Sequence, residues 1–182
     1  MRHRFKRAVA ALALIVVSQA AMAQNPTLDP LFEALRDAEG DAARQIETKI
    51  WEEWADSGSP AMNLLLLRGR EALEAGETGE AIEHFSALID HAPDFTEAYN
   101  ARATAYFQAG RYGPSVADIR EVLARNPRHF GALGGLALIF EETGQSAGAL
   151  AAYRQVEALY PNREGLSEAI ARLEREVEGE DI

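Results

Sequence analysis

The sequence predicts an all-α fold in which short helical hairpins of equal length stack side by side as a solenoid. Three observations predict this fold class. Proline recurs at one constant interval, at Pro93, Pro127 and Pro161, and glycine recurs at the same interval, at Gly76, Gly110 and Gly144. Apolar residues repeat at this interval too, which we call the repeat length. These sets are Leu65, Tyr99, Leu133; Ala72, Tyr106, Phe140; Ile82, Val116, Leu150; Phe85, Ile119, Tyr153; and Leu88, Val122, Val156. Within each unit the apolar residues lie three or four positions apart, as on one face of a helix.

The first unit illustrates how each repeat divides into two helices. Helical spacing runs from about Met62 to Ala75, and Gly76 ends that helix because glycine accepts the left-handed backbone conformation of a C-terminal cap. A second helix runs from about Gly79 to His91, and Pro93 stops it because proline has no N–H to donate. Small residues, Gly69 and Ala81, stand where the paired helices are expected to cross, since a larger side chain there would force the axes apart.

This pattern resembles the tetratricopeptide repeat (TPR) family from Met62 to Arg163, in units 62–95, 96–129 and 130–163. The residues that carry the resemblance in the second and third units are Tyr99, Ala103, Tyr106, Ser115 and Pro127, and Leu133, Leu136, Ala137, Phe140, Ala149, Tyr153 and Pro161. The sequence departs from the family motif where Arg68 and Arg102 replace a leucine, and where Leu88, Val122 and Val156 replace a small residue. The resemblance implies a right-handed solenoid whose concave surface is lined by the first helix of each unit.

Both ends of the array carry amphipathic segments. Residues 24–60 form a predicted N-terminal helical hairpin, broken at Gly40, and the linker Ser57–Pro60. Trp51 lies one repeat length before Phe85, which predicts that this hairpin is a degenerate zeroth repeat. Residues 164–182 form a predicted capping helix and tail. Stacked arrays need such a polar-faced cap, and its apolar stripe consists of Leu166, Ile170, Leu173 and Val177.

Residues 1–23 have the pattern of a secretory signal peptide. Arg2, Arg4, Lys6 and Arg7 precede the apolar run 8–17, and a small-x-small pattern ends at Ala23. An apolar run of about ten residues is too short to span a bilayer, which needs roughly twenty. We therefore expect cleavage after Ala23, export to a bacterial periplasm, and no membrane insertion after cleavage.

Composition excludes several classes of function. The formal net charge of −11 argues against nucleic-acid binding, which needs clustered lysine and arginine. The chain has no cysteine, so a disulfide framework, a thiol nucleophile and cysteine metal ligands are excluded. We attribute the acidity to solubility in preference to an acidic docking face.

No catalytic residue, metal site or cofactor is predicted. The string Gly144-Gln145-Ser146-Ala147-Gly148 matches a nucleophile elbow, but it falls in an inter-helix turn and no histidine follows it. His84, His91 and His129 are expected to be surface residues, because they share no helix face on which they could converge.

The resemblance instead implies a partner-binding groove along the first helices of the units. Its predicted residues are Asn63, Leu66, Arg70, Leu73, Asn100, Thr104, Phe107, Gly134, Leu138 and Glu141. Among them, Leu66, Leu73, Phe107 and Leu138 are expected to form an apolar floor, which is how grooves bind extended or helical peptides. The alternative is that the N-terminal hairpin or a neighbouring molecule covers some of them.

Two details refine the expected groove. Some family members capture a partner's C-terminal carboxylate with lysine and asparagine, but of the corresponding positions here only Arg70 is suitable, so this mode of capture is not expected. Gly131 and Gly134 are costly in a helix, at about 1 kcal/mol each. Either their missing side chains let a partner backbone approach, or they allow close contact between helices or mark a frayed helix start.

The predicted function is that of a non-catalytic adaptor or scaffold in the periplasm that binds a protein or peptide segment in the groove. The alternative is a structural subunit of an envelope complex or a homo-oligomer whose groove is filled by its own chain. A third hypothesis is an enzyme with an unrecognised site, for which the sequence supplies no candidate catalytic residue.

Overall fold

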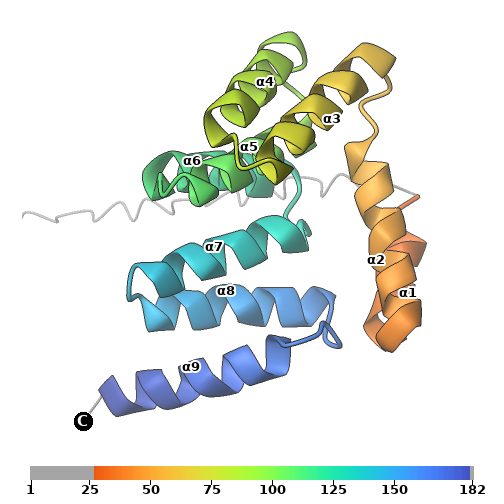
Figure 1. Cartoon of the computed structure of the whole chain (residues 1–182). Helices are drawn as coiled ribbons and strands as arrows, with labels where there is room; N and C mark the ends of the chain where they lie inside the picture. The colour runs from red at the N-terminus through yellow and green to blue at the C-terminus, as the bar shows by residue number, and fades with distance from the viewer. Residues whose placement is uncertain (1–26, 181–182) are drawn as a thin grey trace, which may run out of the picture.

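The structure is a computed structural model that describes residues 27–180. Over these residues it consists of nine α-helices and no strand, which confirms the predicted all-α fold (Figure 1). The predicted signal peptide lies outside the described residues. The helices are α1 (Asp29–Asp37), α2 (Gly40–Ala55), α3 (Pro60–Glu74), α4 (Thr78–His91), α5 (Thr96–Gln108), α6 (Tyr112–Arg125), α7 (Phe130–Glu142), α8 (Ser146–Leu159) and α9 (Leu166–Glu180).

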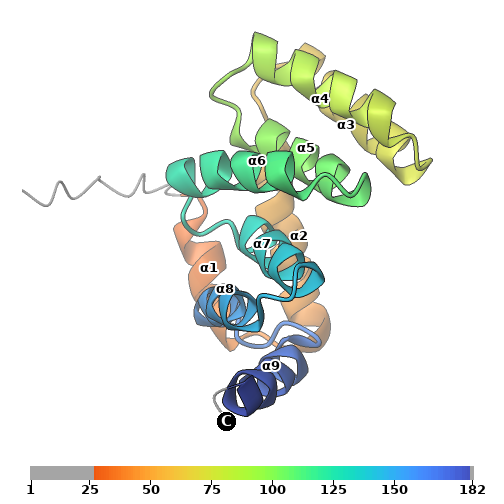
Figure 2. The same ribbon diagram turned by 90° about the vertical axis from the view of Figure 1, so that its left-hand side faces the viewer.

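Six of the helices form three antiparallel hairpins, α3–α4, α5–α6 and α7–α8, which stack in chain order (Figures 1 and 2). The turn inside each hairpin holds the predicted glycine in the left-handed region, with φ of 79° at Gly76 and 68° at both Gly110 and Gly144. Any other residue would be strained there. Of the nucleophile-elbow string, Gly144 and Gln145 lie in the α7–α8 turn, as predicted, and the other three residues begin α8.

Small residues allow the paired helices to approach closely, as the sequence predicts. Gly69 of α3 faces the ring of Phe85 of α4, and a Cβ atom at Gly69 would lie only 2.3 Å from the ring carbon Cε1. In the second hairpin, Ser115 of α6 fills the same kind of position and donates a hydrogen bond to the Ala103 carbonyl oxygen at 2.7 Å. The periodic small residues therefore mark helix crossings.

Arg102, which replaces a leucine of the family motif, has a structural role between α5 and α6. Its guanidinium donates two hydrogen bonds to the buried carboxylate of Asp118, at 2.7 and 2.8 Å. The hydrogen bond with Asp118 raises the pKa of Arg102. A planar ion pair thus replaces apolar packing at this position.

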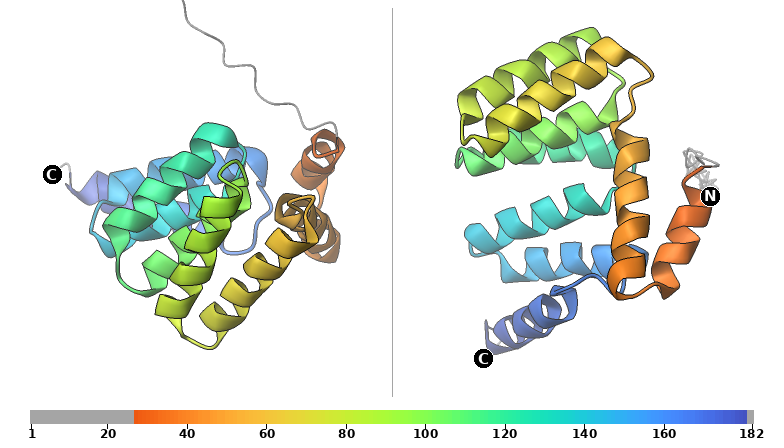
Figure 3. Two further views of the ribbon diagram at one scale, coloured as in Figure 1. Left: turned by 90° about the horizontal axis from the view of Figure 1, so that it is seen from above. Right: turned by 45° about the vertical axis from the view of Figure 1, so that its right-hand side comes forward.

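The N-terminal segment forms the predicted hairpin, but the prediction that it stacks as a zeroth repeat is wrong. Helices α1 and α2 turn back and lie across the ends of later repeat helices (Figure 3). Their buried side chains share one core with α7, α8 and α9. That core contains Leu28, Phe32, Leu35 and Ile50 together with Phe130, Leu133, Val156, Tyr160, Leu166 and Ile170.

The sequence contains the reason for this arrangement. One repeat length before Gly69 and Ala81, the hairpin carries Leu35 and Glu47, so it lacks the small residues that let TPR helices cross closely. Leu35 is buried against the C-terminal repeats instead. Polar contacts complete the docking, since the side chain of Asn162 donates to the Ala38 carbonyl oxygen at 3.0 Å.

The C-terminal helix α9 packs on α8 and forms the predicted cap. Leu166, Ile170 and Leu173 are buried, while Val177 is half-buried. Among the described helices, none combines the length and the apolar character needed to cross a membrane.

Candidate functional site

A cleft of about 490 Å³ lies between α5, α7 and the start of α9, the first helices of successive structural units. Five of the ten predicted groove residues line it, together with residues that were not among the ten, Arg163 being one of them. The five are Asn100, Thr104, Phe107, Gly134 and Leu138.

The floor of this cleft is apolar. Phe107 is half-buried, with its ring centroid 5.7 Å from that of Tyr112, and it packs against the core that contains Ile119 and Ala132. Leu138 leaves 45% of its surface exposed at the mouth of the cleft. Thr104 is exposed, and its hydroxyl donates to the carbonyl oxygen of Asn100 at 3.1 Å. The cleft therefore combines unburied apolar surface with a few polar groups, the usual composition of a ligand site.

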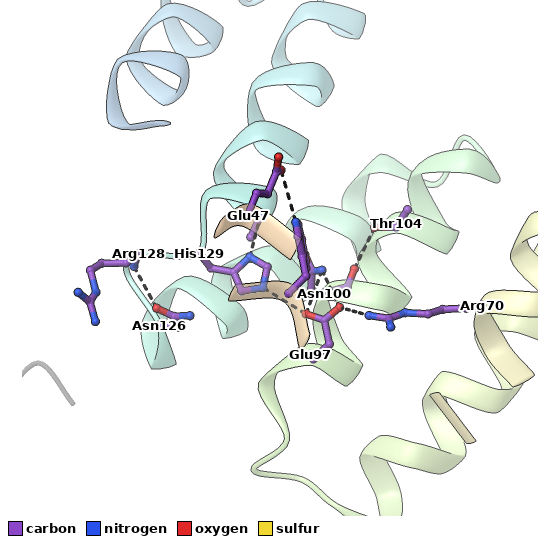
Figure 4. Close-up of polar contacts among 10 residues, drawn as sticks. Glu47, Arg70, Glu97, Asn100, Thr104, Asn126, Arg128 and His129 are labelled. Atoms are coloured by element: carbon purple, nitrogen blue, oxygen red, sulfur yellow. Dashed lines mark hydrogen bonds and ion pairs between the residues drawn. The ribbon is translucent and has the colours of Figure 1, made fainter. Parts of the chain in front are cut away.

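A buried polar network lies beside the cleft, where α5 and α7 begin (Figure 4). The carboxylate of Glu97, only 2% exposed, accepts hydrogen bonds from Arg70 at 2.7 Å and from Asn100 at 3.3 Å. Its other oxygen lies 3.2 Å from Nε2 of His129. Nδ1 of His129 accepts from the Ala132 N–H at 3.0 Å, so Nδ1 carries no proton and Nε2–H donates to Glu97. Every member of this network is thus used within the chain.

Aromatic side chains from α2 cover this network. The indole of Trp54 stacks on His129, with ring centroids 4.0 Å apart and planes 15° apart. Trp51 packs edge-on against His129 and against Phe130. A Cβ atom at Gly131 would lie 2.4 Å from the Trp51 ring, so this glycine makes room for Trp51.

Two predictions are therefore corrected. His129 is not a surface residue, because it is 1% exposed beneath Trp54 and caps the N-terminus of α7. The hypothesis that a partner backbone approaches Gly131 is wrong, because Trp51 fills that position, whereas Gly134 lines the cleft and the same hypothesis for it stays a prediction. Trp51 occupies the space beside Gly131, and the Arg163 guanidinium occupies the space beside Gly134.

The four predicted residues from the first unit lie away from the cleft. Leu66 is buried in the core of the first hairpin, so its prediction as exposed groove floor is wrong, and Leu73 packs against the same core. Arg70 is bound to Glu97. The side chain of Asn63 accepts from the Ser57 N–H at 2.9 Å and thereby fixes the linker between hairpin and array. Three of the four, Asn63, Leu66 and Arg70, line a separate hollow beside α2.

Glu141, the remaining predicted residue, joins α7 to α8 and α9. Its carboxylate accepts a hydrogen bond from the Tyr153 hydroxyl at 2.9 Å and pairs with Arg172. Burial, followed by the hydrogen bond and charge of Glu141, raises the pKa of Tyr153 to about 12. Glu141 therefore shapes the wall near the cleft and does not line it.

Arg163 is the residue of the cleft that sequence reasoning missed. Its guanidinium lies over α7, where a Cβ atom at Gly134 would be 3.1 Å from Nη1. The repeat spacing contained the signal, because Arg163 follows His129 by one repeat length and Phe95 by two. Phe95 and His129 are the N-cap residues of α5 and α7.

The cleft of the described residues has a lining that suits the binding of a ligand. In residues 27–180, no group of three or more histidine and acidic side chains is placed to hold a metal ion. The hydroxyl of Ser146, the serine of the elbow string, donates to Glu176 at 3.2 Å. What the cleft provides is shape, apolar surface and the guanidinium of Arg163.

Comparisons with known proteins agree with this architecture. A family model described as tetratricopeptide repeat matches residues 66–114 and 101–164. A TPR repeat-containing protein of Rhizobium etli is 35% identical over 175 residues, covering 94% of this chain and 86% of that protein.

Two solved structures share the fold. The Sgt2 TPR domain from Aspergillus fumigatus has a TM-score of 0.62 at 21% identity, covering 68% of this chain and 83% of that one. The first TPR of Spaghetti (RPAP3), bound to an HSP90 peptide, has a TM-score of 0.61 at 20% identity, covering 64% and 92%. The repeat spacing, the stacked hairpins and these matches together establish that the chain belongs to the tetratricopeptide repeat family.

Proposed function

We propose that this protein is a non-catalytic adaptor that binds a peptide or protein segment in the cleft between α5, α7 and α9. The observation that carries the proposal is the apolar surface left open there, with Leu138 at the mouth and Phe107 at the floor. Water-exposed apolar area of this kind favours association with an apolar side chain.

The closed network supports the cleft as the place of binding. The side chains of Glu97 and His129 are hydrogen-bonded within the chain, and Trp54 covers His129. A ligand at that point would have to displace the hairpin, whereas at Leu138 it meets exposed surface. Spaghetti is a TPR protein with a bound HSP90 peptide, and by analogy of fold a peptide is the class of ligand proposed here.

The proposed site of action is the bacterial periplasm. This rests on the N-terminal basic residues, the apolar run and the small-x-small pattern ending at Ala23. N-terminal sequencing of the protein recovered from fractionated cells tests it. A chain that begins at Gln24 in the periplasmic fraction is expected, and an uncleaved chain in the cytoplasm would contradict it.

Selection from a library of end-blocked peptides tests the binding function. The wild-type protein is expected to retain peptides with large apolar side chains, and Leu138→Ser is expected to lose them. Leu67→Ser is a matched control, because Leu67 on α3 is similarly exposed, at 51%, but does not line the cleft. Unchanged melting temperatures show that both variants fold. Retention of no peptide, or equal loss in both variants, would refute the proposal.

The alternative is a homo-oligomer that fills the cleft with its own chain. The exposed leucines of α3, Leu64 and Leu67, favour it as a contact surface between copies. Light scattering separates the two: a monomer at micromolar concentration supports the adaptor, and a concentration-independent oligomer supports self-association.

A further inference from the structure

We propose that the cleft is selective for a peptide in which one carboxylate side chain adjoins a large apolar side chain, and that Arg163 binds the carboxylate. This inference rests on the proposed function and adds the chemical class of the ligand. The apolar side chain occupies the space beside Phe107 and Leu138, and the acidic side chain reaches the guanidinium over Gly134.

Comparison of the arginines in residues 27–180 supports an external partner for Arg163. Four of them are half-buried, and three of these four pair with a carboxylate of the chain. Arg70 pairs with Glu97 at 2.7 Å, Arg102 with Asp118 at 2.7 Å and Arg128 with Asp29 at 2.7 Å. Arg163 is the half-buried arginine of this region for which no ion pair with a carboxylate is formed. A partly desolvated cation without a counter-charge is unfavourable, and a ligand carboxylate supplies one.

The position of Arg163 makes it available to a ligand. The absence of a side chain at Gly134 lets the guanidinium lie against α7, where Arg163 lines the cleft. A guanidinium is planar and presents its N–H groups in a fork that matches a carboxylate, so it can bind a carboxylate through two parallel hydrogen bonds.

Nearby charges favour a single carboxylate over an acidic run. Glu164 also lines the cleft. Once Arg163 is engaged, a second ligand carboxylate would face Glu164, and like charges within a few ångströms repel. The arrangement also differs from the capture of a C-terminal carboxylate by basic residues of the first and third units, which is not expected from the sequence.

The test is a binding measurement with fluorescent end-blocked peptides in which Leu or Phe is flanked by Glu, by Gln or by Lys. Blocking both ends removes terminal charges, so only the side chain is compared. Wild-type protein is expected to bind the Glu peptide roughly tenfold more tightly than the Gln peptide, the value of one charge-assisted hydrogen bond. Arg163→Gln is expected to abolish that preference while retaining the Gln peptide. Arg175→Gln, at an exposed arginine of α9, serves as the control and should change neither affinity.

The outcomes separate this inference from the function on which it rests. Equal binding of Glu and Gln peptides by the wild type, or a Glu preference that survives in Arg163→Gln, overturns the role of Arg163 while peptide binding stands. If none of the peptides binds and the library selection also retains none, the proposed function itself fails. A preference for long-chain fatty acids over every peptide would overturn the assignment to a peptide carboxylate.

Discussion

The contact between Gly69 and Phe85 allows a quantitative test of how the repeats pack. Replacing glycine by alanine inside a helix normally stabilises it by about 1 kcal/mol. In α3, however, the new methyl group would lie 2.3 to 2.7 Å from three carbons of the Phe85 ring, which is 0% exposed. Overpacking of this kind costs about 1–3 kcal/mol.

Gly135→Ala in α7 is the matched control. A Cβ atom there would meet Ile119 Cδ1 at 3.7 Å, an ordinary van der Waals contact. Both variants gain the same helix propensity, so the difference between them isolates the clash. We expect Gly69→Ala to be less stable than Gly135→Ala by about 1–3 kcal/mol, measured by urea unfolding followed by circular dichroism.

A double-mutant cycle confirms the source of the difference. Phe85→Leu should cost less in the Gly69→Ala background than in the wild type, with a coupling energy of about 0.5–3 kcal/mol. If Gly69→Ala stabilises the protein as much as Gly135→Ala does, or if the coupling is zero, the close crossing of α3 and α4 is refuted.

Three further predictions address the core, the cap and the N-terminal hairpin. Phe85→Ala should lower the unfolding free energy by about 3–5 kcal/mol. Phe107→Ala should lower it by about 1–2 kcal/mol because its ring is half-exposed, yet only Phe107→Ala should impair peptide binding. Equal losses of unfolding free energy in calorimetry would place Phe107 in the core. The pKa of Tyr153 is raised from 10.0 to about 12 in the folded state, so its contribution to stability is present below pH 10 and is lost as the pH rises to 12. The melting temperature should fall more steeply across that range for wild type than for Tyr153→Phe, and parallel curves would contradict this. Since the chain has no cysteine, the variant Ala38→Cys/Asn162→Cys carries only two thiols. Oxidation should join them in a disulfide within one chain, which changes the mobility of the protein on a gel. Thiols that stay free would argue that the hairpin does not lie on the α8–α9 turn.

The repeat architecture could be predicted from sequence because it depends on local, periodic signals. Glycine recurs in the turn inside each hairpin, where a left-handed backbone conformation is required, at Gly76, Gly110 and Gly144. Gly69 and Ala81 mark the helix crossing. Each repeat contacts its neighbours in the chain, so no long-range information was needed.

The docking of the N-terminal hairpin could not be predicted in this way. Trp51 lies one repeat length before Phe85, which indicates a repeat, but its partners His129 and Phe130 are distant in sequence. Whether Leu35 and Ile50 bury against the first repeat or the third depends on the free energy of the whole molecule. The local sequence signal against a stacked repeat was Leu35, which stands at the position equivalent to Gly69.

The candidate cleft was predicted in part for the same reason. Phe107 and Leu138 occupy repeat positions that the family exposes, and both line the cleft. Leu66 lies at a different repeat position, which corresponds to Asn100 and Gly134, and it is buried at the first hairpin. Arg163 belongs to the turn before α9, outside the helices on which the groove positions were counted.

The most direct test of the account is a map of amide chemical-shift changes in the isotopically labelled protein as an end-blocked Glu–Leu peptide is added. Binding in the cleft predicts the largest changes at Thr104, Phe107, Gly134 and Leu138, with the exposed face of α3 at Leu67 unaffected. Changes centred on Leu67, or no changes at a peptide concentration that saturates binding, would contradict it.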